Sequence, residues 1–219
     1  MNYFQLLESL NELYDLFEGQ EIECAAIVKK IKRKVPFREC RFFAVETMSL
    51  PYGKFIVSGL YDPNQDEQGK PSIQIEIAFP KVKKLRFDNY NLRREHWAEL
   101  CIDLASILGH EFMHVNQFRK RQFEWPRAYQ SKNPDYNQQE IENYYGDSDE
   151  IGAYAFMAAA EVCLDSFSTK KKKDVTKTHL YKTYTKIFKK HDPVVLKFVK
   201  LTNQYTRRLE KQYHATTFR

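Results

Sequence analysis

Residues 108–117 read LGHEFMHVNQ, with His110 and His114 four positions apart and Glu111 directly after the first histidine. The stretch lies inside a run of about residues 92–122 in which apolar residues recur at spacings of three and four. Such a period predicts one long α-helix, and Asn91 is the expected N-cap. Positions i and i+4 of a helix lie on one face, one turn apart. The two imidazoles are therefore expected to hold a single cation between them.

The residue types in this stretch favour zinc with a general base beside it. Neutral imidazole nitrogen binds zinc at roughly 2.0–2.1 Å. Glu111 is rotated by about 100° from His110 around the helix axis, so it is a poor third ligand but can reach a water on the metal. This is the division of roles in the H-E-x-x-H motif. The alternative is a surface helix with two half-exposed histidines, on which Glu111 pairs with Arg119 or Lys120.

A catalytic zinc takes three protein ligands and keeps its fourth position for water, so the sequence must supply one more ligand. Glu150 is the preferred candidate, because it begins an alanine-rich segment, about residues 149–167, that is expected to be a helix. Ala153, about one turn later, is small enough to let this helix pack closely on the histidine helix. Tyr154 shares the face of Glu150 and could donate a hydrogen bond to a developing oxyanion.

Two other interpretations of this segment remain open. Asp147 and Glu150 are spaced like a capping box, in which Glu150 would only satisfy a backbone N–H group. A different residue could also complete the zinc site. Glu161 is the strongest rival, because it lies three turns from Glu150 on nearly the same face. The remaining rivals are Asp147, Asp149, His179 and His191.

The pair HEFMHVNQ and DEIGAYA resembles the gluzincin-type zincin metallopeptidases, and in particular their small phage and bacterial members. The resemblance covers about residues 70–168 and matches His110, His114 and Glu150 to the zinc ligands and Glu111 to the base. It implies Zn²⁺ as cofactor and hydrolysis of a peptide bond in an extended protein or peptide substrate. It also implies a sheet edge strand over the active-site helix that holds the substrate as an added strand, and residues 72–79 (SIQIEIAF) fit that role.

The rest of the chain predicts a mostly helical α+β fold of zincin type. Strands are expected at 41–48, 54–61 and 72–80, and together they could form a small antiparallel sheet. The loops are expected at 62–71 and 124–148, and the other helices at about 3–18, 21–33, 175–190 and 193–213. We expect a metallopeptidase domain over 1–168 and a basic helical C-terminal extension over 169–219 that packs on it.

The charges of this extension differ from those of the rest of the chain. The segment 169–219 holds 15 of the 35 lysines and arginines but only 3 of the 29 acidic residues, a balance of +12 against −6 elsewhere. Its apolar residues recur at helical spacing, which favours a helical hairpin with solvated lysines, including the run Lys170–Lys173. The alternative is a surface for nucleic acid or another polyanion.

The cysteines and the apolar runs of the sequence indicate in which cellular compartment the protein is expected. The four cysteines are scattered and form no C-x-x-C pair, which favours free core thiols in a reducing compartment. No secretory signal or membrane-spanning run is recognised in the sequence. We therefore expect a cytoplasmic bacterial or virus-encoded zinc peptidase without a membrane partner, located in the host cytoplasm or the virion if viral. The alternatives are a DNA-associated metalloprotease that uses the basic tail, and a catalytically inactive zincin fold that serves in binding or structure.

Overall fold

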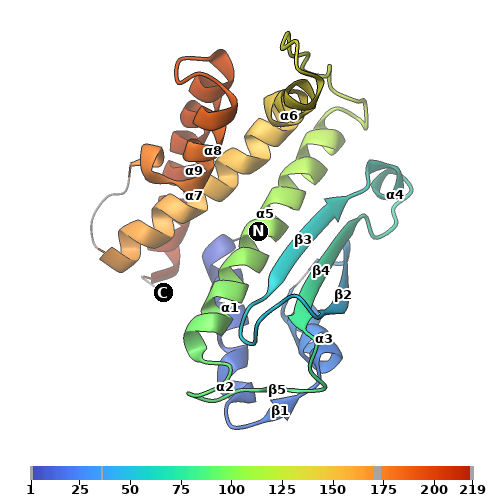
Figure 1. Cartoon of the computed structure of the whole chain (residues 1–219), viewed down its shortest axis with the longest axis vertical. Coiled ribbons are helices and arrows are strands. Elements are labelled where there is room, and N and C mark those ends of the chain that lie inside the picture. Colours follow the sequence, from blue (N-terminus) through green and yellow to red (C-terminus); the bar gives the residue numbers. More distant parts are fainter. Residues whose placement is uncertain (1, 36, 170–173, 218–219) are drawn as a thin grey trace. The chain divides into compact units, whose positions relative to one another are not determined.

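The computed structural model describes residues 2–35, 37–169 and 174–217 (Figure 1). The chain divides into two compact units, Met1–Glu111 and Phe112–Arg219. The boundary falls inside one uninterrupted helix, α5 (Arg94–Lys120), so each unit contains part of it. The predicted division at residue 168 is a different one, and it stays a prediction.

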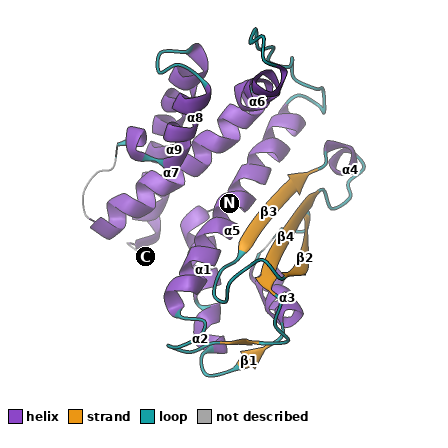
Figure 2. Cartoon of the chain, viewed as in Figure 1, coloured by secondary structure: helices purple, strands orange, loops and turns teal. Residues whose placement is uncertain are grey.

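The first unit combines short helices with two small sheets (Figure 2). Before the start of α5, its elements are α1 (Tyr3–Asn11), α2 (Leu13–Phe17), β1 (Glu21–Ile22), α3 (Cys24–Lys34), β2 (Cys40–Thr47), β3 (Ile56–Tyr61), α4 (Pro63–Glu67), β4 (Ile73–Pro80) and β5 (Leu85–Arg86). The second unit is helical. After the end of α5 it contains α6 (Tyr136–Gly146), α7 (Ser148–Thr169), the 3-10 turn η1 (Val175–Lys177), α8 (His179–Ile187) and α9 (Pro193–Thr217). The prediction of a mostly helical α+β protein is confirmed.

The larger sheet has the strand order β2-β4-β3. β4 pairs antiparallel with β3 but parallel with β2, so the prediction of an antiparallel sheet is wrong for one of the two pairings. The alternating side chains of β4 give the sheet a buried face, because Ile73, Ile75, Ile77 and Phe79 are all fully buried. Burial of this apolar face stabilises the packing of the sheet on the rest of the first unit.

The central position of β4 also corrects the expected substrate strand. Residues 72–79 are hydrogen-bonded on both sides, to β2 and to β3, so they have no free edge for an added strand. Within the described residues, the strands at the two edges of this sheet are β2 and β3.

The N-terminal segments differ in detail from the predicted helices. The predicted helix over 3–18 is interrupted at Glu12, which ends α1 and precedes α2. Residues 21–22 are the strand β1, antiparallel to β5, and the predicted second helix begins only at Cys24. The indole of Trp97, near the start of α5, donates a 3.0 Å hydrogen bond to the Leu10 carbonyl. This buried bond joins α5 to α1.

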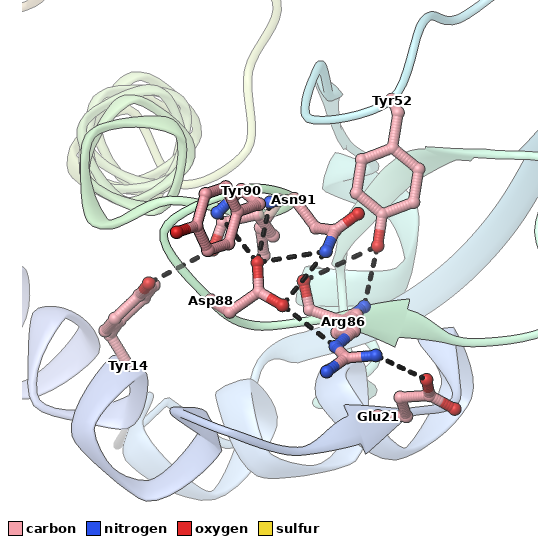
Figure 3. A network of polar contacts seen from close by, with 8 residues as sticks. Tyr14, Glu21, Tyr52, Arg86, Asp88, Tyr90 and Asn91 are labelled. Carbon is pink, nitrogen blue, oxygen red and sulfur yellow. Dashed lines mark hydrogen bonds and ion pairs between the residues drawn. The ribbon is translucent and has the colours of Figure 1, made fainter.

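A polar network before α5 sets the entry into that helix (Figure 3). The Asp88 carboxylate accepts hydrogen bonds from the backbone N–H groups of Tyr90 and Asn91, at 2.8 and 2.7 Å. It also accepts one from the Asn91 side chain, and it pairs with Arg86 at 2.8 Å. The prediction of Asn91 as the N-cap is wrong, because its amide is bound to Asp88 and α5 begins at Arg94.

The second unit has a core formed by α7, α8 and α9, and Figure 1 shows α7 and α9 side by side. Tyr184 and Phe198, from the predicted apolar stripes of the basic segment, are fully buried and stack at 4.3 Å between ring centroids. The predicted break at residues 191–193 is confirmed, since α8 ends at Ile187 and α9 begins at Pro193. The lysine run 170–173 lies outside the described residues.

The expected loop over 124–148 is wrong in its second half, where α6 occupies residues 136–146. The side chain of Asp135 accepts a hydrogen bond from Gln138 N and so caps this helix. Its polar sequence gives little apolar periodicity, and for that reason the pattern resembles a loop.

Two expectations from composition can be compared with the structure. All four cysteines, Cys24, Cys40, Cys101 and Cys163, are free and buried, as expected for core thiols. Among the helices that the structure describes, none is long and apolar enough to span a membrane.

Candidate metal centre

The central part of α5 buries the three residues of the motif. The exposed fractions are 6% for His110, 5% for Glu111 and 9% for His114. The alternative of two half-exposed histidines on a surface helix therefore does not hold. Imidazoles in such a place need polar partners or a metal, because burying an unsatisfied polar group is costly.

Glu150, at the start of α7, joins the two histidines in one cluster. The ligand atoms of His110, His114 and Glu150 all lie within 4.8 Å of one another. His114 Nε2 and Glu150 Oε1 are 3.4 Å apart, and two ligands of a tetrahedral zinc at 2.0–2.1 Å would be separated by about 3.4 Å. His110 precedes His114 by one turn of the same uninterrupted helix, which fixes its place beside the pair. Two imidazoles and one carboxylate are a donor set that suits zinc.

The rival ligands are engaged elsewhere. Glu161, on α7, accepts a hydrogen bond from the backbone N–H of His179, the first residue of α8, at 3.2 Å. Asp149 pairs with Arg121, and Asp147 accepts from Asp149 N at 2.8 Å. His191 is exposed, in the turn between α8 and α9. Of the candidates for the third ligand, only Glu150 forms a group with the two histidines in the described part of the chain.

The capping-box interpretation of Glu150 is not observed either. The backbone N–H of Asp147, which that motif would direct to Glu150, donates instead to the Tyr144 carbonyl at 3.2 Å. The Asp147 side chain still caps the start of α7 through Asp149 N. The Glu150 carboxylate is therefore directed to His114 rather than to the end of its own helix.

Hydrogen bonds and an ion pair join the end of α5 to the start of α7 within the second unit. The Gln117 side chain lies between His114 and Asp149. Its Oε1 atom is 3.1 Å from His114 Nδ1, and its Nε2 atom donates a 3.1 Å hydrogen bond to the Asp149 carbonyl. Arg121 forms a two-pronged ion pair with the Asp149 carboxylate at 2.9 and 2.5 Å. These contacts fix Asp149, the residue that directly precedes Glu150.

Tyrosines surround Glu150 on its other side. The hydroxyl groups of Tyr144 and Tyr154 are 3.1 Å apart, and the rings of Tyr145 and Tyr154 stack at 5.3 Å. Burial raises the pKa of Tyr144 to about 12, and the charge of Glu150 and a hydrogen bond to its carboxylate act in the same direction. Burial and the bond to Tyr144 likewise raise the pKa of Tyr154 far above its ordinary value. Both phenols are therefore neutral hydrogen-bond donors at physiological pH.

This arrangement bears on the role expected for Tyr154. The Tyr144 hydroxyl is hydrogen-bonded to the Glu150 carboxylate, which as an anion can only accept. The single proton of Tyr144 is thereby used, so Tyr154 donates the 3.1 Å bond between the two hydroxyl groups. In the described conformation the Tyr154 hydroxyl thus supports the Glu150 carboxylate through Tyr144. A direct bond from Tyr154 to an oxyanion stays a prediction.

Glu111 meets the sheet of the first unit at Gly59, on the edge strand β3. A Cβ atom on Gly59 would lie 2.7 Å from Glu111 Oε1 and 2.7 Å from Ile107 Cγ2. Any larger side chain at residue 59 would therefore displace the carboxylate. The absence of a side chain is what lets β3 pass directly over the candidate base.

Sequence reasoning assigned no role to the supporting residues of this site. Gln117 stands three positions after His114, a spacing that places it beside the histidine on the helix surface. Tyr144 lies in the stretch expected to be a loop, and nothing in its local pattern distinguishes it from neighbouring tyrosines. The role of Gly59 depends on the contact between β3 and α5, which is not encoded locally.

Comparisons of the chain with models of protein families, with curated proteins and with solved structures return no match.

Proposed function

We propose that the protein is a zinc-dependent peptidase that hydrolyses peptide bonds. The observation that carries this proposal is the buried group of His110, His114 and Glu150, with Glu111 adjacent to the first ligand. A purely structural zinc usually has four protein ligands, often cysteines. A three-residue set with a buried carboxylate beside it is typical of a catalytic site.

The chemistry follows from the roles that these side chains can take. When bound, zinc would supply a Lewis acid that activates water and polarises the scissile carbonyl. His110, His114 and Glu150 would hold the ion. The Glu111 carboxylate would accept a proton from the attacking water and transfer it to the amine of the leaving group. Tyr144 would orient the Glu150 carboxylate, since its neutral hydroxyl donates a hydrogen bond to it.

The edge strand β3 is the best candidate for binding the substrate. Within the described residues it pairs only with β4, so its outer backbone groups can pair with an extended peptide. Its Gly59 lies against Glu111. A peptide added along this strand would run past the candidate base, and its backbone hydrogen bonds would give affinity with little dependence on side chains. This assignment replaces the predicted residues 72–79.

Metal content tests the site. We expect about one zinc ion per chain in the wild type and a strongly reduced content in His110→Ala and Glu150→Gln, measured by plasma mass spectrometry after dialysis. Glu161→Gln is the matched control, because Glu161 is bound at the start of α8 and the substitution should leave zinc unchanged. Equal metal content in His110→Ala, Glu150→Gln and the wild type would contradict the proposed site.

Cleavage of a peptide library tests the reaction. Glu111→Gln keeps a side chain of the same shape but removes the base, so we expect it to retain zinc and to lose cleavage. Loss of a general base typically costs 10²–10⁴-fold in rate. If this variant cleaves as well as the wild type, the mechanism is wrong. If the wild type binds zinc but cleaves nothing in the library, the site belongs to a binding or structural protein instead.

A further inference from the structure

We propose that Gln117 is a positioning residue that sets the tautomer of His114 and ties that ligand to the helix carrying Glu150. The inference rests on the proposed metal site, because it assigns a supporting role toward two of its ligands. Gln117 is half-buried on α5, one turn after His114.

The partner on α7 determines which way the Gln117 amide faces. A backbone carbonyl can only accept a hydrogen bond, so the group 3.1 Å from the Asp149 carbonyl must be the NH₂ group. The Gln117 carbonyl oxygen then faces His114 Nδ1 at 3.1 Å. An amide oxygen also only accepts. His114 Nδ1 must therefore carry the proton of this hydrogen bond.

This tautomer leaves the lone pair of the neutral ring on His114 Nε2. That nitrogen is 3.4 Å from Glu150 Oε1, inside the ligand cluster. An imidazole binds a metal through the unprotonated nitrogen, and the partner of its other nitrogen decides which one that is. With Nδ1 bound to Gln117, Nε2 is the nitrogen of His114 that is available to a metal beside Glu150.

The other end of the same amide acts on the second ligand helix. Asp149 directly precedes Glu150, and its carboxylate is fixed by Arg121 at 2.9 and 2.5 Å. The carbonyl that receives the Gln117 NH₂ group is therefore well fixed. Gly152 makes room for this contact, because a Cβ atom there would lie 2.8 Å from Gln117 Nε2.

A spectroscopic measurement on metal-free protein tests the tautomer. Long-range ¹H–¹⁵N spectra of the histidine rings, recorded over a series of pH values, distinguish the Nδ1–H form, the Nε2–H form and the doubly protonated ring. We expect the Nδ1–H form of His114 in the wild type, assigned by its absence in His114→Ala. Gln117→Leu should shift the ring toward the Nε2–H form. Gln117→Glu should keep the wild-type form, because its carboxylate still accepts from Nδ1.

The control is Asn116→Leu, a neighbouring amide that is exposed on the same helix, and it should leave the His114 spectrum unchanged. If Gln117 were only a structural tie, Gln117→Leu would lower stability and leave the tautomer as it is. An unchanged Nδ1–H signal in folded Gln117→Leu overturns the proposal. Because no metal is present, this result does not depend on whether the zinc site itself is correct.

Zinc affinity supplies the second measurement, by competition with a chromophoric chelator. Loss of a partner that orients a ligating histidine typically weakens metal binding 10–100-fold, and we expect this for Gln117→Leu. Gly152→Ala should weaken zinc binding in the wild type, because the added methyl displaces the Gln117 amide.

The same Gly152→Ala change in a Gln117→Ala background should have almost no further effect, because there is no amide left to displace. Additive losses in the double variant would contradict the contact. If even the wild type binds no zinc, the proposed function fails, while the tautomer experiment still decides the role of Gln117.

Discussion

Gly59→Ala is the substitution that most directly probes how the sheet positions the candidate base. The new methyl group would meet Glu111 Oε1 and Ile107 Cγ2 at 2.7 Å and Glu111 Cγ at 2.8 Å. Ordinary van der Waals contacts begin at about 3.4 Å, so the methyl intrudes by about 0.7 Å on two separate side chains. Since the intrusion reaches Cγ as well as the carboxylate, a rotation of the carboxylate alone does not relieve it.

The expected cost combines two opposing effects. Overpacking of a well-packed site costs typically 1–3 kcal/mol. Replacing glycine by alanine in a strand recovers roughly 0.5–1 kcal/mol of backbone entropy. We therefore expect Gly59→Ala to lower the free energy of unfolding by up to about 2.5 kcal/mol. We also expect it to displace the Glu111 carboxylate while His110 and His114 keep their places on α5.

The measurements are urea denaturation, zinc content and peptide cleavage. Gly59→Ala should retain zinc and lose most of its cleavage, whereas a change in the histidines would remove both. Ser58→Ala is the control, because Ser58 is exposed and belongs to the opposite face of β3. A Gly59→Ala protein that is as stable and as active as the wild type would refute the close approach of β3 to Glu111.

Two further predictions concern the groups around the site. Arg121→Met leaves the Asp149 carboxylate buried without its ion-pair partner; such changes cost about 3–5 kcal/mol when fully buried. Arg121 is 28% exposed, so we expect about 2–3 kcal/mol by urea denaturation, largely recovered in the double variant with Asp149→Asn. Burial, aided by the charges of Glu39 and Glu111, raises the pKa of the Cys40 thiol from 9.0 to about 12. The neutral thiol favours the folded state, and this contribution to stability is fully present below pH 9 and is lost as the pH rises to 12. Over this pH range the urea midpoint should therefore fall less steeply in Cys40→Ala than in the wild type. Native Cys40 should also resist a thiol reagent at pH 8.

Periodic features of the chain were predictable because they repeat locally. The spacing of apolar residues around His110 and His114 gave the helix, and the i, i+4 rule placed both rings on one face. The alternation of isoleucines gave β4, and the stripes around Tyr184 and Phe198 gave the C-terminal helices. In each case the face that the pattern marked as apolar is buried.

Features that depend on distant partners were not predictable in the same way. The alternation in residues 73–79 indicates one buried face, but it does not tell whether a strand is central or at an edge. Edge status depends on the position of β3, which follows β2 in the chain yet, among the strands that the structure describes, pairs with β4 alone. The choice of Glu150 over Glu161 depended on which part of α7 lies beside α5. That position is set by Gln117 and Arg121 through their contacts with Asp149.

These contacts have a consequence for how variants of the metal site can be interpreted. In small zinc domains the ligands come together only with the metal, so loss of the metal unfolds the protein. Here Gln117 and Arg121 hold Asp149, and therefore the start of α7, through bonds that involve no metal. The core of α7, α8 and α9 further anchors that helix through Ile151, one residue after Glu150. The contacts formed on folding are thus enough to place Glu150 beside His114, and no metal is needed for it. Loss of zinc binding in Glu150→Gln or His110→Ala should then report the affinity of the site rather than loss of the fold, which circular dichroism of the metal-free variants would verify.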